Sequence, residues 1–182
     1  MDLILERFNL IGFRLINDLA GSLGLLDWTM IFFAKWVGYL MILYVLWWAW
    51  KSRAEFKKII VVTVGSAIIA RYVFVEVIRY FVYSPRPFAI LENVNQLIAH
   101  DSTSSFPSGH TSFFFALAFG AYFLNKKTGT WFLVLAGLIG LARIFAGVHW
   151  PLDVAAGVVV GWAVVRIVYL SWRKFARAPN IF

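Results

Sequence analysis

Five apolar stretches, each close to the length of a membrane-spanning helix, restrict what this chain can fold into. They cover residues 28–50, 59–82, 107–124, 131–148 and 151–172. About 20 apolar residues cross the hydrocarbon core of a bilayer as a helix, which satisfies its own backbone hydrogen bonds. With 62% hydrophobic and only 14% charged residues, the composition also departs from that of soluble domains. We therefore predict an all-α integral membrane protein with about five transmembrane helices in a bundle.

The segment before the first span has the pattern of an amphipathic helix over residues 2–19. Its polar face comprises Asp2, Glu6, Arg7, Arg14, Asn17 and Asp18, and its apolar face Ile4, Leu5, Phe8, Ile11, Leu15, Ile16 and Leu19. Such a helix either lies in the membrane interface or packs on the bundle, and the pattern leaves both readings open. We expect a single membrane domain with an interfacial helix over 1–22, a transmembrane bundle over 28–172 and a cytoplasmic tail over 173–182.

The basic residues predict how the chain is oriented in the membrane. They gather in three groups, Lys51, Arg53, Lys57 and Lys58, then Lys126 and Lys127, then Arg173, Lys174 and Arg177. All three groups fall on the same side of the predicted bundle, which should be cytoplasmic because cytoplasmic loops are enriched in lysine and arginine. The net charge of +8 is thus a topology signal, and we expect no nucleic-acid partner. Because the chain has no cysteine, disulfides and thiolate chemistry are excluded.

The opposite side of the predicted bundle carries three polar strings. In the first, Pro107, Ser108, Gly109 and His110 lead from a loop into the third span. Free N–H groups and the helix dipole favour an anion at such a helix start, and glycine allows its close approach. An ordinary capped helix start explains the same residues equally well when they are considered alone.

The second string combines Arg143 with His149 and Asp153. His149 should lie just before the fifth span and Asp153 within its first turn. A carboxylate there can fix the imidazole tautomer and leave the other ring nitrogen free to attack. Arg143 offers a planar fork suited to phosphate oxygens. A buried His–Asp pair with only a structural role is the alternative.

The third string places Arg79 at the end of the second span and Arg86 in the following loop. Either arginine alone is more typical of an interface anchor. Convergence of all three strings on one membrane face instead indicates a site that handles a phosphate. Glu76 is expected to form a structural ion pair with Arg79 or Arg71, and His100 and Asp101 are expected to be solvated.

These strings resemble a known family. Arg79-x6-Arg86-Pro87, the run 107–110 and Arg143-x5-His149-x3-Asp153 are similar, in order and spacing, to the three signature motifs of the type 2 phosphatidic acid phosphatase superfamily. Two positions depart from the family pattern. Arg79 replaces a lysine and keeps its charge, whereas Ala142 replaces a serine and removes one hydroxyl donor to the phosphate.

The resemblance implies a catalytic role for three residues. His149 would form a phosphohistidine, Asp153 would orient it, and His110 would protonate the leaving oxygen and then help to activate water. The implied phosphate-binding residues are Arg79, Arg86, Pro87, Ser108, Gly109 and Arg143. Three arginines can stabilise charge on the phosphoryl oxygens, so we expect no metal and no cofactor.

The string from Asp101 to Phe106 and the compact size look most like bacterial undecaprenyl-diphosphatases within this superfamily. The resemblance then implies hydrolysis of undecaprenyl diphosphate in a bacterial inner membrane. Because the basic groups predict the opposite side to be cytoplasmic, we expect the site to face the extracytoplasmic side. Phosphatidylglycerophosphate, phosphatidate or lipid A is the alternative substrate, and a non-catalytic lipid-anion binding or transport protein is the alternative class. No required protein partner is evident. Lys35 either extends to the membrane surface or binds the second phosphate of a diphosphate substrate.

Overall fold

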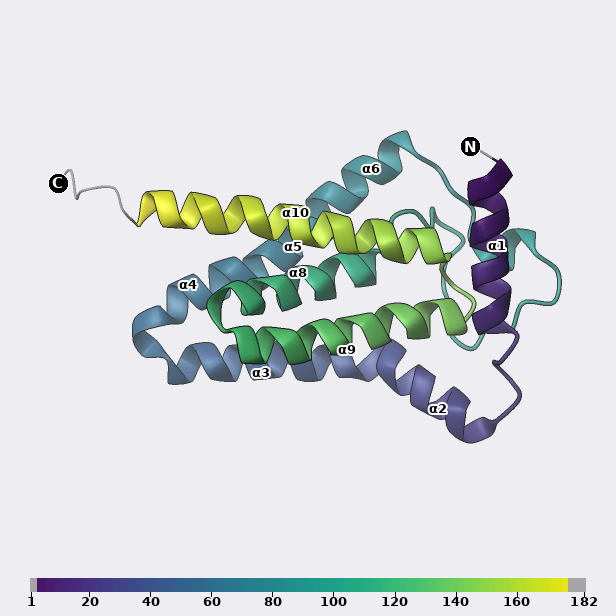
Figure 1. Ribbon diagram of the computed structural model, residues 1–182, viewed down its shortest axis with the longest axis horizontal. Coiled ribbons are helices and arrows are strands. Elements are labelled where there is room, and N and C mark those ends of the chain that lie inside the picture. Colours follow the sequence, from purple (N-terminus) through teal and green to yellow (C-terminus); the bar gives the residue numbers. More distant parts are fainter. Residues whose placement is uncertain (1–2, 177–182) are drawn as a thin grey trace.

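A computed structural model of the chain describes residues 3–176, and every regular element within them is helical (Figure 1). In chain order the α-helices are α1 (Leu3–Asn17), α2 (Gly24–Phe32), α3 (Gly38–Lys51), α4 (Phe56–Ile60), α5 (Ser66–Ile69), α6 (Val75–Phe81), α7 (Pro87–Ile90), α8 (Gly109–Leu124), α9 (Lys126–Phe145) and α10 (Pro151–Phe175). One π-helical turn, η1 (Phe33–Val37), interrupts the first long helical segment, and two more, η3 (Val61–Gly65) and η4 (Ala70–Phe74), interrupt the second. A 3-10 turn, η2 (Arg53–Glu55), begins that second segment. The predicted all-α membrane architecture is confirmed.

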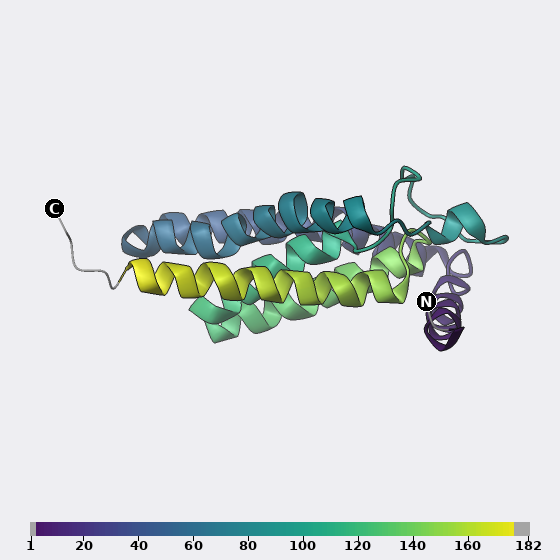
Figure 2. The ribbon, with the colours of Figure 1, turned by 90° about the horizontal axis from the view of Figure 1, so that it is seen from above.

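Four helical segments are long and apolar enough to cross a membrane. They are Gly24–Lys51, Arg53–Phe81, Lys126–Phe145 and Pro151–Phe175. The remaining apolar helix, α8, has only 16 residues and lies between α9 and α10 at the centre of the bundle (Figures 1 and 2). A short helix suffices there because other helices, rather than lipid, surround it.

Helix boundaries differ from the expected ones where side chains cap the ends. The α8 helix begins at Gly109 rather than at residue 107, because the Ser108 hydroxyl accepts the N–H of Thr111. The α9 helix begins at Lys126 rather than at residue 131, since the Asn125 side chain accepts the N–H of Thr128 at 3.0 Å. It ends at Phe145, before the expected residue 148, and thereby frees a turn that carries His149.

The α8 and α10 helices approach each other closely at glycine positions. A Cβ atom on Gly157 would lie 2.8 Å from the Cβ of Thr111 and 3.0 Å from the carbonyl oxygen of Ser108. Gly161 similarly faces the backbone of Ser112 and Ala116. The small-residue spacing in the last span therefore packs α10 against the start of α8, as expected of close helix contacts in membranes.

The α1 helix lies across one end of the bundle, roughly perpendicular to the long helices (Figure 1). One edge packs inward through Phe13 and Asn17, which are both fully buried. The apolar face remains exposed, with Phe8 at 65% and Leu15 at 71% exposure. The helix therefore packs on the bundle through one edge, and its position in the membrane interface stays a prediction that the exposed apolar face supports. Helical periodicity placed Asn17 on the polar face of this helix. In the structure its side chain is buried and anchors α1 to the bundle.

Asn17 joins α1 to both segments that form the end of the bundle. Its Nδ2 donates to the carbonyl oxygens of Asn95 and Phe145 at 2.9 and 2.8 Å, and its Oδ1 accepts the N–H of Asn95 at 3.1 Å. We expect Asn17→Ala to lower the free energy of unfolding by about 2–4 kcal/mol, because buried partners lose their hydrogen bonds. Thermal unfolding in detergent checks this, with the exposed Asp18→Ala as control. Equal melting temperatures for the two variants would contradict the anchoring role.

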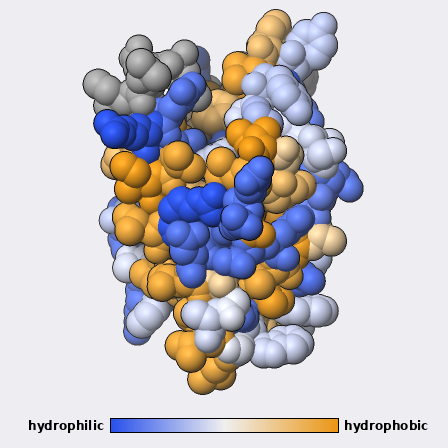
Figure 3. Space-filling view, turned by 90° about the vertical axis from the view of Figure 1, so that its right-hand side faces the viewer, coloured by the Kyte–Doolittle hydropathy of each residue, from blue (hydrophilic) through white to orange (hydrophobic). Residues whose placement is uncertain are grey.

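The C-terminal helix α10 continues to Phe175, so the expected tail, 173–182, begins within it. Residues 1, 2 and 177–182 of the expected segments lie outside the described part of the chain. The end of the molecule that carries α1, the 82–108 loop and the α9–α10 turn is called the loop end below. A hydrophilic patch lies in the middle of this end and is bordered by hydrophobic side chains (Figure 3).

Candidate active site

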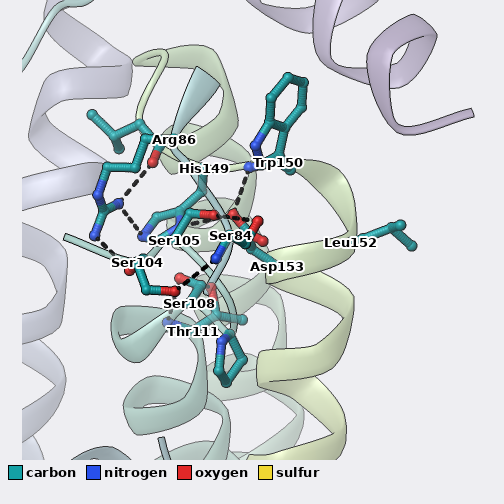
Figure 4. Close-up of polar contacts among 12 residues, drawn as sticks. Ser84, Arg86, Ser104, Ser105, Ser108, Thr111, His149, Trp150, Leu152 and Asp153 are labelled. Carbon is teal, nitrogen blue, oxygen red and sulfur yellow. Dashed lines mark hydrogen bonds and ion pairs between the residues drawn. The ribbon is translucent and has the colours of Figure 1, made fainter. Parts of the chain in front are cut away.

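The α9–α10 turn positions a buried histidine–aspartate pair at the loop end. His149 and Asp153 are 1% and 2% exposed, and His149 Nδ1 lies 3.2 Å from Asp153 Oδ2. The same carboxylate oxygen accepts the N–H of Trp150 at 2.9 Å, which caps the start of α10 (Figure 4). The carboxylate can thus hold the Nδ1 proton of the imidazole, so that Nε2 carries the free lone pair.

Arg86 approaches that free nitrogen from the 82–108 loop. Its guanidinium is fully buried, and Nη1 lies 3.3 Å from His149 Nε2 while donating to the carbonyl oxygen of Val148 at 2.8 Å (Figure 4). Nε donates to Thr103 O at 3.1 Å and Nη2 to Ser104 O at 3.4 Å. Arg86 therefore joins two loops and puts a fixed positive charge beside His149 Nε2.

Two further arginines have nitrogens without a protein partner. Arg143 is 3% exposed in the last turn of α9, and its Nε and Nη2 lack a hydrogen-bond partner within the described residues. Arg79 donates from Nη2 to the Pro107 carbonyl oxygen at 3.1 Å, whereas its Nε has no hydrogen-bond partner among residues 3–176. Buried donors without partners are costly, so these guanidinium groups are suited to an anionic ligand.

The start of α8 joins this cluster through the backbone. The Ser108 N–H donates to the Asp153 carbonyl oxygen at 3.0 Å, which fixes the second motif against the third. The Ser108 hydroxyl is buried and accepts from the Thr111 hydroxyl at 2.9 Å. In this arrangement the side chain caps the helix, and its contact with phosphate stays a prediction. Pro87 is the first residue of α7 and is likewise buried.

A cavity of about 410 Å³ brings four of the predicted site residues together. Its lining includes Arg79, Gly109, His110 and His149. His110 is exposed to this space from the first turn of α8, whereas Arg143 and Lys35 border an adjoining cavity of about 310 Å³ that also reaches His110. His110 thus lies where the two cavities meet, which suits a group that exchanges protons with a substrate.

Sequence reasoning missed several residues of the main cavity. His100 was expected to be solvated, yet it is only partly exposed and lines this cavity, with its ring centroid 6.1 Å from that of His149. Asp101 is exposed, as expected, and also borders the cavity. The loop brings them back because Ile98 is buried and the Ser105 hydroxyl donates to Ser84 Oγ at 3.1 Å. The apolar pair Leu97 and Ile98, just before His100, was a signal in the sequence that could have indicated this return.

Glu76 and Arg71 also line the main cavity. Glu76 forms an ion pair with Arg71 and lies 3.5 Å from Arg79 Nη1. The expected ion pair is therefore present and includes both arginines. Its position at the cavity, rather than on the lipid-facing surface, could not be read from helical spacing alone.

Burial and neighbouring arginines keep the loop histidines neutral. Burial, followed by the charges of Arg143 and Arg86, holds the pKa of His149 well below its usual 6.5. Burial and the same two arginines, Arg86 first, lower the pKa of His100 to about 4. Burial, followed by the charge of Arg79, lowers the pKa of Arg86 to about 10, so it remains cationic at neutral pH. The imidazole of His149 therefore has an unprotonated nitrogen available for attack.

The lowered pKa values of the two loop histidines can be tested by titrating their imidazoles. Lowered pKa values mean that His149 and His100 take up a proton only as the pH falls well below 6.5, so both should be neutral at pH 6. Nitrogen-15 NMR of histidine-labelled protein measures this directly, since the chain has three histidines. The His149→Gln and His100→Gln variants supply the assignments. A midpoint near 6.5 for either residue would contradict the burial described here.

Comparison with known proteins places this geometry in a family. The sequence model of the PAP2 superfamily matches residues 60–177, which is more than half of the chain. The chain is 36% identical over 167 residues to the "Bacitracin transport permease protein BcrC" of Bacillus licheniformis, a match that covers 92% of this chain and 81% of the relative. It is 34% identical over 151 residues to the undecaprenyl-diphosphatase BcrC of Bacillus subtilis, covering 81% and 76%.

A solved structure agrees with these sequence matches. The crystal structure of Aquifex aeolicus LpxE superimposes with a TM-score of 0.75 at 33% identity, and the match covers 90% of this chain and 95% of that one. The long apolar helices and the bacterial relatives together describe a multi-pass membrane protein. The resemblance seen in the three motifs is confirmed, and the chain belongs to the PAP2 superfamily.

Proposed function

We propose that this PAP2 protein is a lipid phosphatase that hydrolyses undecaprenyl diphosphate to undecaprenyl phosphate through a phosphohistidine intermediate. The observation that carries the proposal is the buried His149–Asp153 pair. His149 Nδ1 lies 3.2 Å from Asp153 Oδ2, and His149 Nε2 lies beside the Arg86 guanidinium. The named Bacillus subtilis relative supports the substrate. The three motifs hold the phosphate rather than the lipid tail, so the substrate rests on that relationship.

In the proposed first step, His149 Nε2 attacks the terminal phosphorus. A P–N bond forms as the bond from phosphorus to the bridging oxygen breaks, and His110 gives its proton to the departing lipid phosphate. Arg79, Arg86 and Arg143 stabilise the negative charge on the three equatorial oxygens, a task that their fixed or unpartnered guanidinium nitrogens suit.

In the proposed second step, His110 takes a proton from water, which attacks the same phosphorus. The P–N bond breaks, orthophosphate leaves, and the pair formed by His149 and Asp153 is restored. Because the arginines supply the positive charge, the proposed reaction uses no metal ion. We further propose that the site faces the extracytoplasmic side of a bacterial inner membrane, since the basic residues of the three groups that the structure describes, up to Lys174, lie at the opposite end of the bundle from the site.

Phosphate release by the purified protein in detergent, with chelator present, tests the proposed function. The substrates to compare are undecaprenyl diphosphate, phosphatidylglycerophosphate, phosphatidate and lipid A. We expect a clear preference for undecaprenyl diphosphate. Preference for another lipid would retain the mechanism and overturn the substrate. No release from any of them would favour a transport protein, and dependence on added metal would contradict the proposed chemistry.

A further inference from the structure

Two cationic side chains outside the three motifs border the space beside His110. Lys35, on η1 in the first span, and Arg71, on η4 in the second, both line a cavity of about 180 Å³ that His110 also lines. Both residues thus lie on π-helical turns, which alter the direction of side chains and are frequent at functional sites. Within residues 3–176 no carboxylate pairs with Lys35.

The Arg71 side chain is held over the second motif. A Cβ atom on Gly109 would fall 2.7 Å from Arg71 Cδ, so the glycine leaves room for this side chain. Arg71 also borders the main cavity, where Glu76 binds its guanidinium. Arg71, Gly109 and His110 are therefore shared by the main cavity and the 180 Å³ cavity. A ligand that extends from one to the other would pass Arg71.

The chemistry of a diphosphate places its second phosphate on this side. The attacked terminal phosphate lies next to His149, and the leaving oxygen lies next to His110, which protonates it. That oxygen bridges to the proximal phosphate, which must therefore lie beyond His110, away from His149. Lys35 and Arg71 are the cations that border this space. A lipid monophosphate would place only an uncharged alkyl or glyceryl group there.

The walls of the 180 Å³ cavity suit the lipid that follows the proximal phosphate. Its other lining residues are apolar or aromatic and include Tyr39, Ile42, Tyr72 and Phe113. Tyr39 and Tyr72 are 62% and 64% exposed on the outside of the bundle. The cavity therefore leads from two cations to the lipid-facing surface, in the order that an isoprenyl diphosphate presents its phosphates and its tail.

We propose that Lys35 and Arg71 form a binding site for the proximal phosphate of a lipid diphosphate and set the preference for diphosphates over monophosphates. This inference rests on the proposed function and names two residues that determine its specificity. The ion pair with Glu76 holds Arg71 in place at this cavity. Lys35 and Arg71 thus bind the part of the substrate that leaves, whereas the motif arginines bind the part that is transferred.

The test compares farnesyl diphosphate with farnesyl monophosphate, which have the same tail and differ by one phosphate. We expect Lys35→Met and Arg71→Gln each to lower kcat/KM for the diphosphate by about tenfold or more, because a charge-assisted contact is lost. The decrease for the monophosphate should be much smaller. Lys51→Met and Arg166→Gln, exposed positions remote from these cavities, are matched controls and should leave the ratio of the two kcat/KM values unchanged.

Conservative variants separate a charge effect from a folding defect. Lys35→Arg and Arg71→Lys keep the cation, so they should retain most of the preference for diphosphate, even if Arg71→Gln fails to fold. Inhibition by free anions gives a second measurement. The inhibition constant of methylene diphosphonate should rise in Lys35→Met and Arg71→Gln. The inhibition constant of orthophosphate should change little in the same variants.

Outcomes that overturn this inference differ from those that overturn the proposed function. If the parent protein hydrolyses farnesyl diphosphate but the variants lose activity on both substrates in equal proportion, or on neither, the second phosphate site is wrong and the function stands. If the parent protein releases phosphate from no lipid diphosphate, the proposed function fails and the site fails with it.

Discussion

Replacing His149 with glutamine should abolish phosphate release from every lipid that the parent protein hydrolyses. Glutamine retains a polar side chain of similar reach but has no nucleophilic nitrogen, so no P–N bond can form. The expected decrease in kcat is at least about 10³-fold, the scale observed when a covalent nucleophile is removed. Measurement of steady-state phosphate release in detergent, with lipid binding recorded in parallel, checks this.

Trapping the intermediate makes the same prediction more specific. Brief reaction with a substrate labelled in its terminal phosphate, followed by alkaline denaturation, should leave label on the parent protein and none on the His149→Gln variant. The matched control is His100→Gln, because His100 lines the same cavity but has no role in the proposed transfer. It should keep the label and lose less than about tenfold in kcat. Label retained on the His149→Gln protein would identify a different nucleophile.

The membrane spans and the contacts among the motif residues could be predicted from the sequence. The spans follow from hydropathy because lipid imposes a length and an apolar surface on each helix. The motif residues converge because they lie at helix ends, and helix ends on one side of a membrane are necessarily close. Asp153 lies in the first turn of α10 and His149 just before that helix, so their contact could be predicted from the sequence.

Other features depend on packing that no local pattern encodes. Helical spacing places Asn17 on a polar face, but its hydrogen bonds to Asn95 and Phe145 come from segments far along the chain. The π-helical turns that carry Lys35 and Arg71 cannot be read from periodicity, and they change which way both side chains point. The sequence could therefore suggest Lys35 as a partner of a second phosphate, whereas the place of Arg71 beside it emerges only in three dimensions.

Asp153→Asn should leave the fold largely intact and lower kcat by about 10²–10⁴-fold, as expected when a carboxylate that orients a catalytic histidine is neutralised. The Asp153 carboxylate accepts from Trp150 N–H at 2.9 Å and lies 3.2 Å from His149 Nδ1. An amide oxygen can still accept from Trp150, so the start of α10 is preserved. The same oxygen also faces His149 Nδ1, so the amide can still accept the Nδ1 proton, but a neutral amide cannot stabilise a positive charge on His149.

Two measurements on the purified variant separate orientation from a structural role. Thermal unfolding in detergent should give a melting temperature close to that of the parent protein, while phosphate release decreases. Asp153→Ala is the informative contrast, because it removes both contacts and should lower stability as well as turnover. An Asp153→Asn protein that fails to insert or unfolds in detergent would show that the buried pair is structural. One that retains full turnover would show that His149 needs no carboxylate partner, and the mechanism would then have to rest on Arg86, whose Nη1 lies 3.3 Å from His149 Nε2.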